Sequence, residues 1–148
     1  MSETNANTGT VLKTERTISA SSAQIFEAFR QPEKLARWWG PSGFTNTFEV
    51  FNFVPGGLWK FVMHAPNGTD YPNECVFREI EPESRVVIDH VAEPHFTLTI
   101  SLRAHEDHTH LTWEQAFKSA EVAEKLRSMC EPANEQNLDR LEMVLAGK

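Results

Sequence analysis

The chain has little cysteine and no long apolar segment, and both absences limit where it can work. Only Cys75 and Cys130 occur among 148 residues, too few for the disulfide framework of a small secreted domain or for a four-cysteine metal site. No apolar run approaches the roughly 20 residues that a membrane-spanning helix needs. Residues 1–10 are polar and lack the apolar stretch of a secretory signal. We therefore expect a cytoplasmic protein with reduced thiols and no membrane partner.

Basic residues are also in short supply. The chain has 14 Lys and Arg against 21 Asp and Glu, for a net charge of -7 and a pI near 5.3. Nucleic-acid binding depends on clustered Lys and Arg that contact phosphates, so nucleic acid is excluded as a partner. The sequence also lacks a glycine-rich phosphate-binding loop and the Ser-His-Asp pattern of a catalytic triad. We assign no cofactor, no metal and no catalytic residue, and we expect a binding protein rather than an enzyme.

The chain does have enough apolar sequence for a packed domain. Hydrophobic residues make up 40% and charged residues 24%, which is ordinary for a globular protein. Residues 1–10 are small and polar and are expected to form a disordered tail. Residues 11–148 are expected to form a single domain.

The pattern of apolar residues predicts an α+β domain. Val11–Ser19 is rich in Thr and Ile, which is typical of a strand. Ser21 or Ser22 offers an N-cap for a short helix, and Pro32 suits the first turn of a second helix that ends at Trp39. Six strands with short connections are then expected as an antiparallel meander. They are Phe48–Val54, Leu58–His64, Asn73–Ile80, Arg85–His90, Phe96–Leu102 and His110–Phe117.

Helical spacing returns after Ser119 and continues towards the end of the chain. Pro132 is expected to interrupt this segment, because proline lacks the N–H that a helix interior needs. The apolar face of the final helix must cover the sheet. The pattern therefore predicts a strand, two short helices, about six antiparallel strands and a C-terminal helix that covers the sheet.

Aromatic residues concentrate between residues 35 and 71, where three of the four Trp residues occur. This region holds Leu35–Pro41 (Leu-Ala-Arg-Trp-Trp-Gly-Pro), Pro55–Met63 (Pro-Gly-Gly-Leu-Trp-Lys-Phe-Val-Met) and Pro66–Tyr71 (Pro-Asn-Gly-Thr-Asp-Tyr). Pro and Gly set the bends between the aromatic segments. Large aromatic side chains placed in this way form either a packed core or the wall of a ligand pocket, and the residues alone leave both open.

These segments resemble the family of proteins related to the C-terminal domain of the Hsp90 ATPase activator. The resemblance rests on Pro32–Pro41, Pro55–Met63, Pro66–Asn73 and Gln136–Leu141, which occur in the expected order. That family belongs to the START-like, helix-grip superfamily, which also contains polyketide cyclases and lipid-transfer domains. The resemblance implies a helix-grip α+β fold, in which a curved antiparallel sheet of about six or seven strands wraps around a long C-terminal helix and two short helices follow the first strand. It also implies an apolar cavity between the sheet and that helix. It implies no particular ligand, because most bacterial single-domain members have none assigned.

Two departures from the family pattern bear on function. Members often carry an Asp-x-Arg pair beside the Pro-Gly-Gly turn, where this chain has Asn52, Phe53 and Val54. Catalysis near that turn is therefore disfavoured. Members also often have a Trp before the motif of the last helix, where this chain has Asn134. If that Trp closes the cavity, the cavity of this chain is larger or more polar.

Three possible chemical sites have simpler interpretations. His105, His108 and His110 have a spacing that could bind zinc, but they fall at a predicted hairpin turn, where solvated histidines are expected. Cys75 is expected to be a small buried apolar residue rather than a nucleophile, because no neighbour in sequence could activate it. Glu79 is either a cavity carboxylate with a raised pKa or a strand-end residue satisfied by solvent or an arginine, and we favour the second.

We predict that the protein binds a small hydrophobic or aromatic molecule between the sheet and the C-terminal helix. One alternative is a cyclase or hydrolase that uses a cavity carboxylate or histidine. Another is a co-regulator of the chaperone Hsp90, but Hsp90 is not expected as a partner, because 148 residues are too few to hold the activator's additional N-terminal domain.

The aromatic strand faces and the resemblance together name the residues of the expected site. Exposed strand edges make either a monomer or a homodimer possible. The predicted ligand-binding residues are Trp39, Trp59, Phe61, Met63, Tyr71, Cys75, Phe77, Leu98, Ile100, Trp113, Asn134, Leu138 and Leu141.

Overall fold

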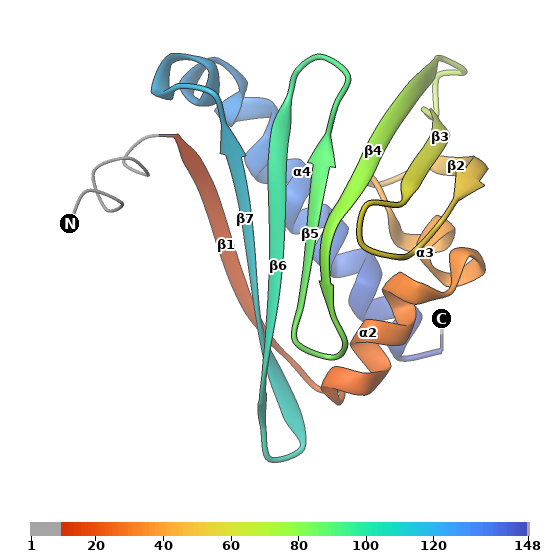
Figure 1. Ribbon diagram of the computed structural model, residues 1–148, viewed down its shortest axis with the longest axis vertical. Helices are drawn as coiled ribbons and strands as arrows, with labels where there is room; N and C mark the ends of the chain where they lie inside the picture. The colour runs from red at the N-terminus through yellow and green to blue at the C-terminus, as the bar shows by residue number, and fades with distance from the viewer. Residues whose placement is uncertain (1–9, 148) are drawn as a thin grey trace.

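The computed structural model describes residues 10–147, and its strands form one seven-stranded sheet (Figure 1). The predicted tail lies outside the described residues except for Thr10. The elements are β1 Val11–Ile18, α2 Ser22–Arg30, α3 Pro32–Trp38, β2 Thr45–Phe51, β3 Leu58–His64, β4 Asp70–Glu81, β5 Arg85–His90, β6 Phe96–His105, β7 His108–Phe117 and α4 Ala120–Leu145.

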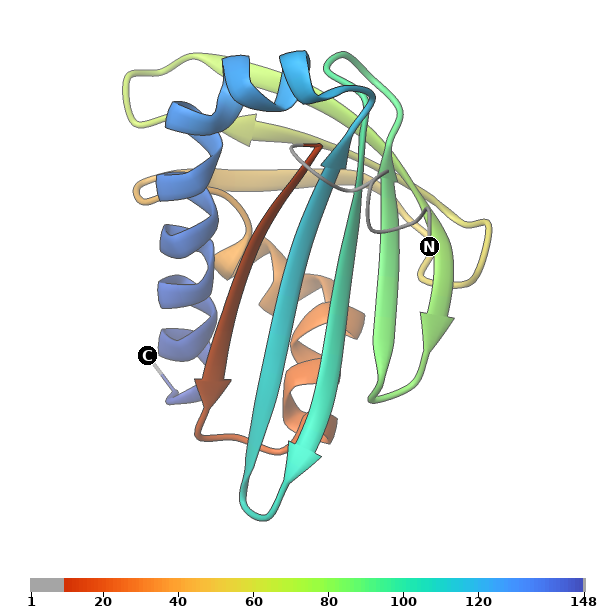
Figure 2. The same ribbon diagram turned by 90° about the vertical axis from the view of Figure 1, so that its left-hand side faces the viewer.

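The sheet has the order β1-β7-β6-β5-β4-β3-β2, and every neighbouring pair is antiparallel. β2 to β7 form the predicted meander, and β1 joins the free side of β7. The long helix α4 crosses behind the sheet in Figure 1, and Figure 2 shows the sheet curving around it. The predicted helix-grip fold, with two short helices after the first strand, is confirmed.

Local signals begin the two short helices where the sequence predicted them. The Ser21 Oγ accepts a hydrogen bond from the Gln24 N–H at 3.1 Å, and the Gln24 Oε1 accepts one from the Ser21 N–H at 2.9 Å. This reciprocal pair satisfies two free donors at the start of α2. Pro32 lies in the first turn of α3, where its missing N–H removes no helical hydrogen bond.

The C-terminal helix differs from the prediction at Pro132. We predicted that this proline would interrupt the helix, but α4 runs without a break over Ala120–Leu145. A proline inside a helix removes one hydrogen bond and bends the axis, and packing on both sides can keep the helix intact. Figure 2 shows such a bend, because the first turns of α4 lie across one end of the sheet and the rest runs along it. No helix within residues 10–147 combines the length and apolar composition needed to cross a membrane.

The strand β2 also departs from its predicted limits. It spans Thr45–Phe51 instead of residues 48–54, and its pairing with β3 shifts register between Phe48 and Val50. A bulge of this kind inserts one residue and reverses the alternation of faces. Phe48 and Phe51 both pack against the core as a result, which explains why the sequence shows apolar residues on both faces of this strand.

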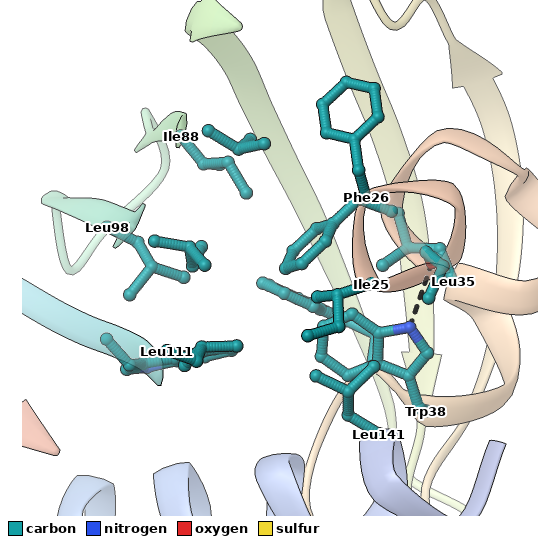
Figure 3. Packing of buried hydrophobic residues seen from close by; sticks show 14 of the residues in the cluster. Ile25, Phe26, Leu35, Trp38, Ile88, Leu98, Leu111 and Leu141 are labelled. Atoms are coloured by element: carbon teal, nitrogen blue, oxygen red, sulfur yellow. Dashed lines mark hydrogen bonds between the residues drawn. The ribbon is translucent and has the colours of Figure 1, made fainter. Parts of the chain in front are cut away.

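Alternate residues of the strands point towards the helices and form the core. Figure 3 shows side chains from the helices, Ile25, Phe26, Leu35, Trp38 and Leu141, meeting Ile88, Leu98 and Leu111 from the sheet. The Trp38 ring is fully buried, and its indole N–H donates to the Ala28 carbonyl at 3.0 Å. This tryptophan therefore enters the core without leaving a donor unpaired.

Arg140 of α4 holds the loop between α3 and β2. Its guanidinium donates to carbonyl groups at 2.8–3.2 Å, those of Arg37, Trp39, Gly40, Pro41 and Phe44. Burial lowers the pKa of this Arg140 side chain. Its charge is therefore met by the dipoles of neutral carbonyls, in a place partly shielded from water.

Two neighbouring side chains of α4 bind the same loop. The Gly40 N–H donates to the Asn137 Oδ1 at 2.8 Å, and the Ser42 N–H donates to the Gln136 Oε1 at 3.0 Å. Gly40 has a φ of 98°, in the left-handed region that side chains other than glycine rarely adopt, so glycine favours this conformation of the loop. The segment Gln136–Leu141 thus binds Leu35–Pro41, and two of the motifs that carry the family resemblance touch each other.

Replacing Arg140 with alanine is expected to lower the free energy of unfolding by about 2 kcal/mol, because several partly buried carbonyl groups lose a charged donor. Arg127→Ala is the matched control on the same helix. Arg127 pairs with Glu124 and Glu131 at the surface, and its loss is expected to cost about 0.5 kcal/mol or less. Urea unfolding followed by tryptophan fluorescence measures both variants, and equal costs would contradict the role assigned to Arg140.

Candidate functional site

The predicted ligand-binding residues lie on the inner face of the sheet and on the helical elements that cover it, with Trp39 after α3 and Asn134, Leu138 and Leu141 in α4. Two of them lie near the tip of the β3–β4 hairpin, where Met63 is half-buried and Tyr71 is 48% exposed. The others are buried: Trp39, Trp59, Phe61, Cys75, Phe77, Leu98, Ile100, Trp113, Asn134, Leu138 and Leu141. The fold therefore brings the predicted set together, with Tyr71 at its margin.

Aromatic rings occupy the middle of this inner face. Trp59 stacks on Phe61 with ring centres 4.3 Å apart, and on Phe77 at 5.5 Å. Trp39 contacts both Trp59 and Trp113, with ring centres 5.1 and 5.9 Å apart. Rings at these separations are in contact. This region is packed core, and a ligand can enter it only if side chains move.

Two indole N–H groups of this aromatic cluster have no acceptor among the described residues. They belong to Trp59 and Trp113, which are 0% and 1% exposed. A buried donor without a partner costs about 1–3 kcal/mol, and such groups are uncommon in native proteins. Trp38, by contrast, has its N–H bonded to Ala28. The inner face therefore offers two donors that an acceptor on a ligand could satisfy.

A buried polar pair lies between the main core and a smaller apolar cluster at the start of α4. The smaller cluster contains Leu12, Phe117 and Ala123. Along β7 and α4, the residues between the two clusters are Gln115 and Asn134. The Asn134 Nδ2 donates to the Gln115 Oε1 at 3.1 Å, and both side chains are buried. The interior is therefore polar at the level of this pair.

His90 is a buried titratable group on the same face. Its Nδ1 lies 2.9 Å from the Pro94 carbonyl oxygen, and its Nε2 lies 2.6 Å from the Asn73 Oδ1. The Asn73 Nδ2 donates to the Tyr71 carbonyl, which turns the amide oxygen towards His90. Burial lowers the pKa of His90 below 6.5, and nearby backbone acceptors raise it to a smaller extent. A neutral imidazole has one N–H, so only one of these two oxygens accepts a hydrogen bond from it. The other nitrogen also lies against a protein oxygen, so the ring is not open to a ligand as a base.

His90 is also the cross-strand neighbour of Cys75. The sequence did not reveal this pairing, because it depends on the register of β4 and β5. A cysteine beside a histidine is the arrangement of a thiol nucleophile. Here burial, together with the charges of Asp89 and Glu74, raises the pKa of Cys75 to about 12. The thiol stays protonated at neutral pH, so this pair lacks the thiolate that nucleophilic chemistry needs.

Glu79 lies away from the inner face. A register shift after Phe77 pairs Glu79 with Val87, whose neighbours Val86 and Ile88 are the ones that point inward. The Glu79 carboxylate accepts a hydrogen bond from the Arg85 guanidinium at 2.7 Å. The interpretation of Glu79 as a residue satisfied by an arginine is confirmed.

The histidines of the β6–β7 hairpin lie at its tip, as predicted. The rings of His105 and His108 have centres 5.3 Å apart, and His110 contacts the Glu15 carboxylate at 2.6 Å. Within the part of the chain that the structure describes, no group of three His, Cys, Asp or Glu side chains could hold a metal ion.

A hollow of about 430 Å³ lies between β1 and α4. Of the predicted ligand-binding residues, Asn134 lines it, and the aromatic ones do not. Asn134 is the position where family members often have a Trp. The Asn134 side chain lines the hollow, and its amide donates to Gln115 in the interior. A polar group therefore separates the hollow from the interior at this point.

Cys75 is expected to resist alkylation in the folded protein. Its pKa of about 12 leaves almost no thiolate near neutral pH. Cys130 is only half-buried and is expected to react at least about tenfold faster with iodoacetamide. Mass spectrometry after timed labelling measures both rates, and labelling in urea, where the two should react alike, is the control. Rapid native labelling of Cys75 would revive the nucleophile interpretation.

Stability is expected to depend on pH through His90. Its pKa is lowered in the folded protein, so the unfolded chain binds the proton more readily. The stabilisation is complete above the ordinary value of 6.5 and is lost as the pH falls through the lowered value. His90→Gln should therefore flatten the slope of unfolding free energy against pH below about 7. His105→Gln, at the exposed hairpin tip, is the control, and an unchanged slope in His90→Gln would contradict the assignment.

Comparison with solved structures shows the same fold in several bacterial proteins. One from Arthrobacter aurescens is 24% identical, with a TM-score of 0.88 over 95% of this chain and 88% of that chain. One from Nitrosomonas europaea is 22% identical, with a TM-score of 0.87 over 94% of this chain and 96% of that chain. An AHSA1-like protein from Aeromonas hydrophila is 15% identical, with a TM-score of 0.71 over 90% of this chain and 94% of that chain. Identities this low show likeness of fold alone.

No curated protein matches the chain. The model of one protein family, described as Activator of Hsp90 ATPase homolog 1-like protein, matches residues 19–146. This match begins just after β1 and covers every element from α2 to α4, including the contact between the loop after α3 and the last helix. The chain therefore belongs to the family of Activator of Hsp90 ATPase homolog 1-like proteins, in the START-like, helix-grip superfamily.

Proposed function

We propose that the protein binds a small hydrophobic or aromatic molecule between the inner face of the sheet and α4. At the level of the family, the fold supports a ligand-binding domain. The observation that carries the proposal is the pair of unpaired, buried indole donors of Trp59 and Trp113. Ligand pockets combine apolar walls with a few placed polar groups, and these two donors among aromatic rings have that character.

Trp39 is the side chain that would have to move for a ligand to enter. It contacts both Trp59 and Trp113, and at 8% exposed it is the one of the three that reaches the surface. Its backbone carbonyl is held by Arg140, and its ring also packs on Trp38 with ring centres 5.6 Å apart, so ligand entry requires the ring to leave three indole contacts while the loop stays in place. Rotation of this ring would expose the two donors to an incoming acceptor.

A matched pair of aromatic compounds tests the proposal. Ligand-detected NMR and native mass spectrometry should find 2-acetylnaphthalene and 2-ethylnaphthalene bound to the protein. The two have nearly the same shape, but only the first carries a carbonyl acceptor. We expect 2-acetylnaphthalene to bind about five- to tenfold more tightly, which corresponds to one net hydrogen bond. Failure of both compounds to bind would reject the proposal.

Variants of the tryptophans locate the site. Trp59→Phe and Trp113→Phe keep an aromatic ring and remove an unpaired N–H, so the preference for 2-acetylnaphthalene should disappear in at least one of them. Trp38→Phe is the control, because it removes an N–H that is already bonded to Ala28. It should lower the free energy of unfolding by about 1–3 kcal/mol through the unpaired carbonyl, and it should leave the ligand preference unchanged. A preference that survives in both test variants would place the ligand elsewhere.

A further inference from the structure

The hollow between β1 and α4 has the features of a second binding site. Its volume of about 430 Å³ lies within the range of small-molecule pockets. Leu12 and Thr14 line it from β1, and Ser128, Pro132 and Asn134 line it from α4. None of its lining residues belongs to the aromatic cluster, so an inference about it does not depend on the proposed function.

Two oxygen acceptors at this hollow lack a donor. Pro132 has no N–H, so the Ser128 carbonyl, four residues earlier in α4, lacks the usual helical hydrogen bond from that position. Asn134 is 7% exposed, and its Nδ2 donates to Gln115, but its Oδ1 has no donor among residues 10–147. This oxygen is not one of the described buried side-chain atoms without a partner, so solvent reaches it and a ligand donor can take the place of water. The bend of α4 therefore leaves the hollow suited to a ligand that donates hydrogen bonds.

Two carboxylates at the hollow add negative charge. Glu131 and Glu135 line it, and they pair with Arg127 and Arg16, each at 2.6 Å. Glu131 is exposed, and an exposed ion pair contributes little to stability, so its carboxylate can turn towards a ligand at small cost. Glu135 is held more firmly, because Thr14 also donates to it and Arg16 belongs to a network with Asp139 and Glu142. Lys13 also lines the hollow. Its ammonium lies 3.7 Å from a carboxylate oxygen of Glu15, a residue that does not line the hollow.

We propose that this hollow binds a primary ammonium group carried on a short apolar chain. An ammonium has three N–H donors and no acceptor, which matches the Ser128 carbonyl, the Asn134 Oδ1 and the Glu131 carboxylate. The Leu12 side chain and the Pro132 ring give the apolar chain a surface to pack against. An anion would meet acceptors and like charge in the same place.

An NMR titration of isotope-labelled protein with n-butylammonium tests this proposal. We expect saturable shifts confined to resonances of residues 12–14 and 128–135. Butyltrimethylammonium has the same charge but no N–H donor, and butyrate reverses the charge. Both should bind at least about tenfold more weakly, because they cannot make charge-assisted hydrogen bonds to the acceptors. Shifts that do not saturate, or equal binding of either analogue, would overturn the proposal.

Matched variants test separately the contact with the Ser128 carbonyl and the contact with the Glu131 carboxylate. Pro132→Ala restores an N–H that can bond the Ser128 carbonyl, and it should weaken n-butylammonium binding by about three- to tenfold. Pro82→Ala, in the turn between β4 and β5, should not. Because Pro132→Ala also straightens α4, Glu131→Gln provides a second test with an unchanged backbone. Its control is Glu124→Gln, which removes the other partner of Arg127. Wild-type affinity in both Pro132→Ala and Glu131→Gln would refute the site.

Discussion

The Arg140 guanidinium, bound to the backbone carbonyls of the loop after α3, holds the long helix in place across the sheet. That loop carries Trp39 into the aromatic cluster and leads into the edge strand β2. Its position therefore decides how the inner face is closed. A charged donor that meets several neutral carbonyls in a partly buried place is strong, because each bond is charge-assisted and water competes weakly.

The clamp fastens the C-terminal half of α4, and the half before Pro132 packs through Ala123 against Leu12 and Phe117. The polar groups without protein partners occur in two separate places, the aromatic cluster of the inner face and the hollow beside β1. The donors of Trp59 and Trp113 face the closed part of the interior, and the acceptors of Ser128 and Asn134 lie at the open hollow beside β1. Donors and acceptors in such places favour ligands of opposite hydrogen-bonding character. One small domain can in this way have two sites that differ in chemistry.

Much of this architecture could be predicted from local patterns. Alternating apolar residues predicted the inner face of β6 and β7, and a serine and a proline predicted the starts of α2 and α3. The prediction was wrong at Pro132, because the rule that proline ends a helix ignores the packing of the flanking turns. It was also wrong at the ends of β2, because the bulge at Phe48 shifts which residues pair with β3. Neither error could be corrected without knowing the neighbouring elements.

The sequence by itself determined the order of the elements and the strand residues that share the inner face, since turn residues and periodicity act over a few neighbouring residues, and its motifs carried the resemblance that implied the helix-grip fold. Only the tertiary structure decided the partners of individual polar groups. It placed Asn137 on the backbone of Gly40, brought His90 beside Cys75, and left the Trp59 and Trp113 donors unpaired. The physical reason is that a hydrogen-bond partner or a pKa depends on groups far away in the chain, which only folding brings together.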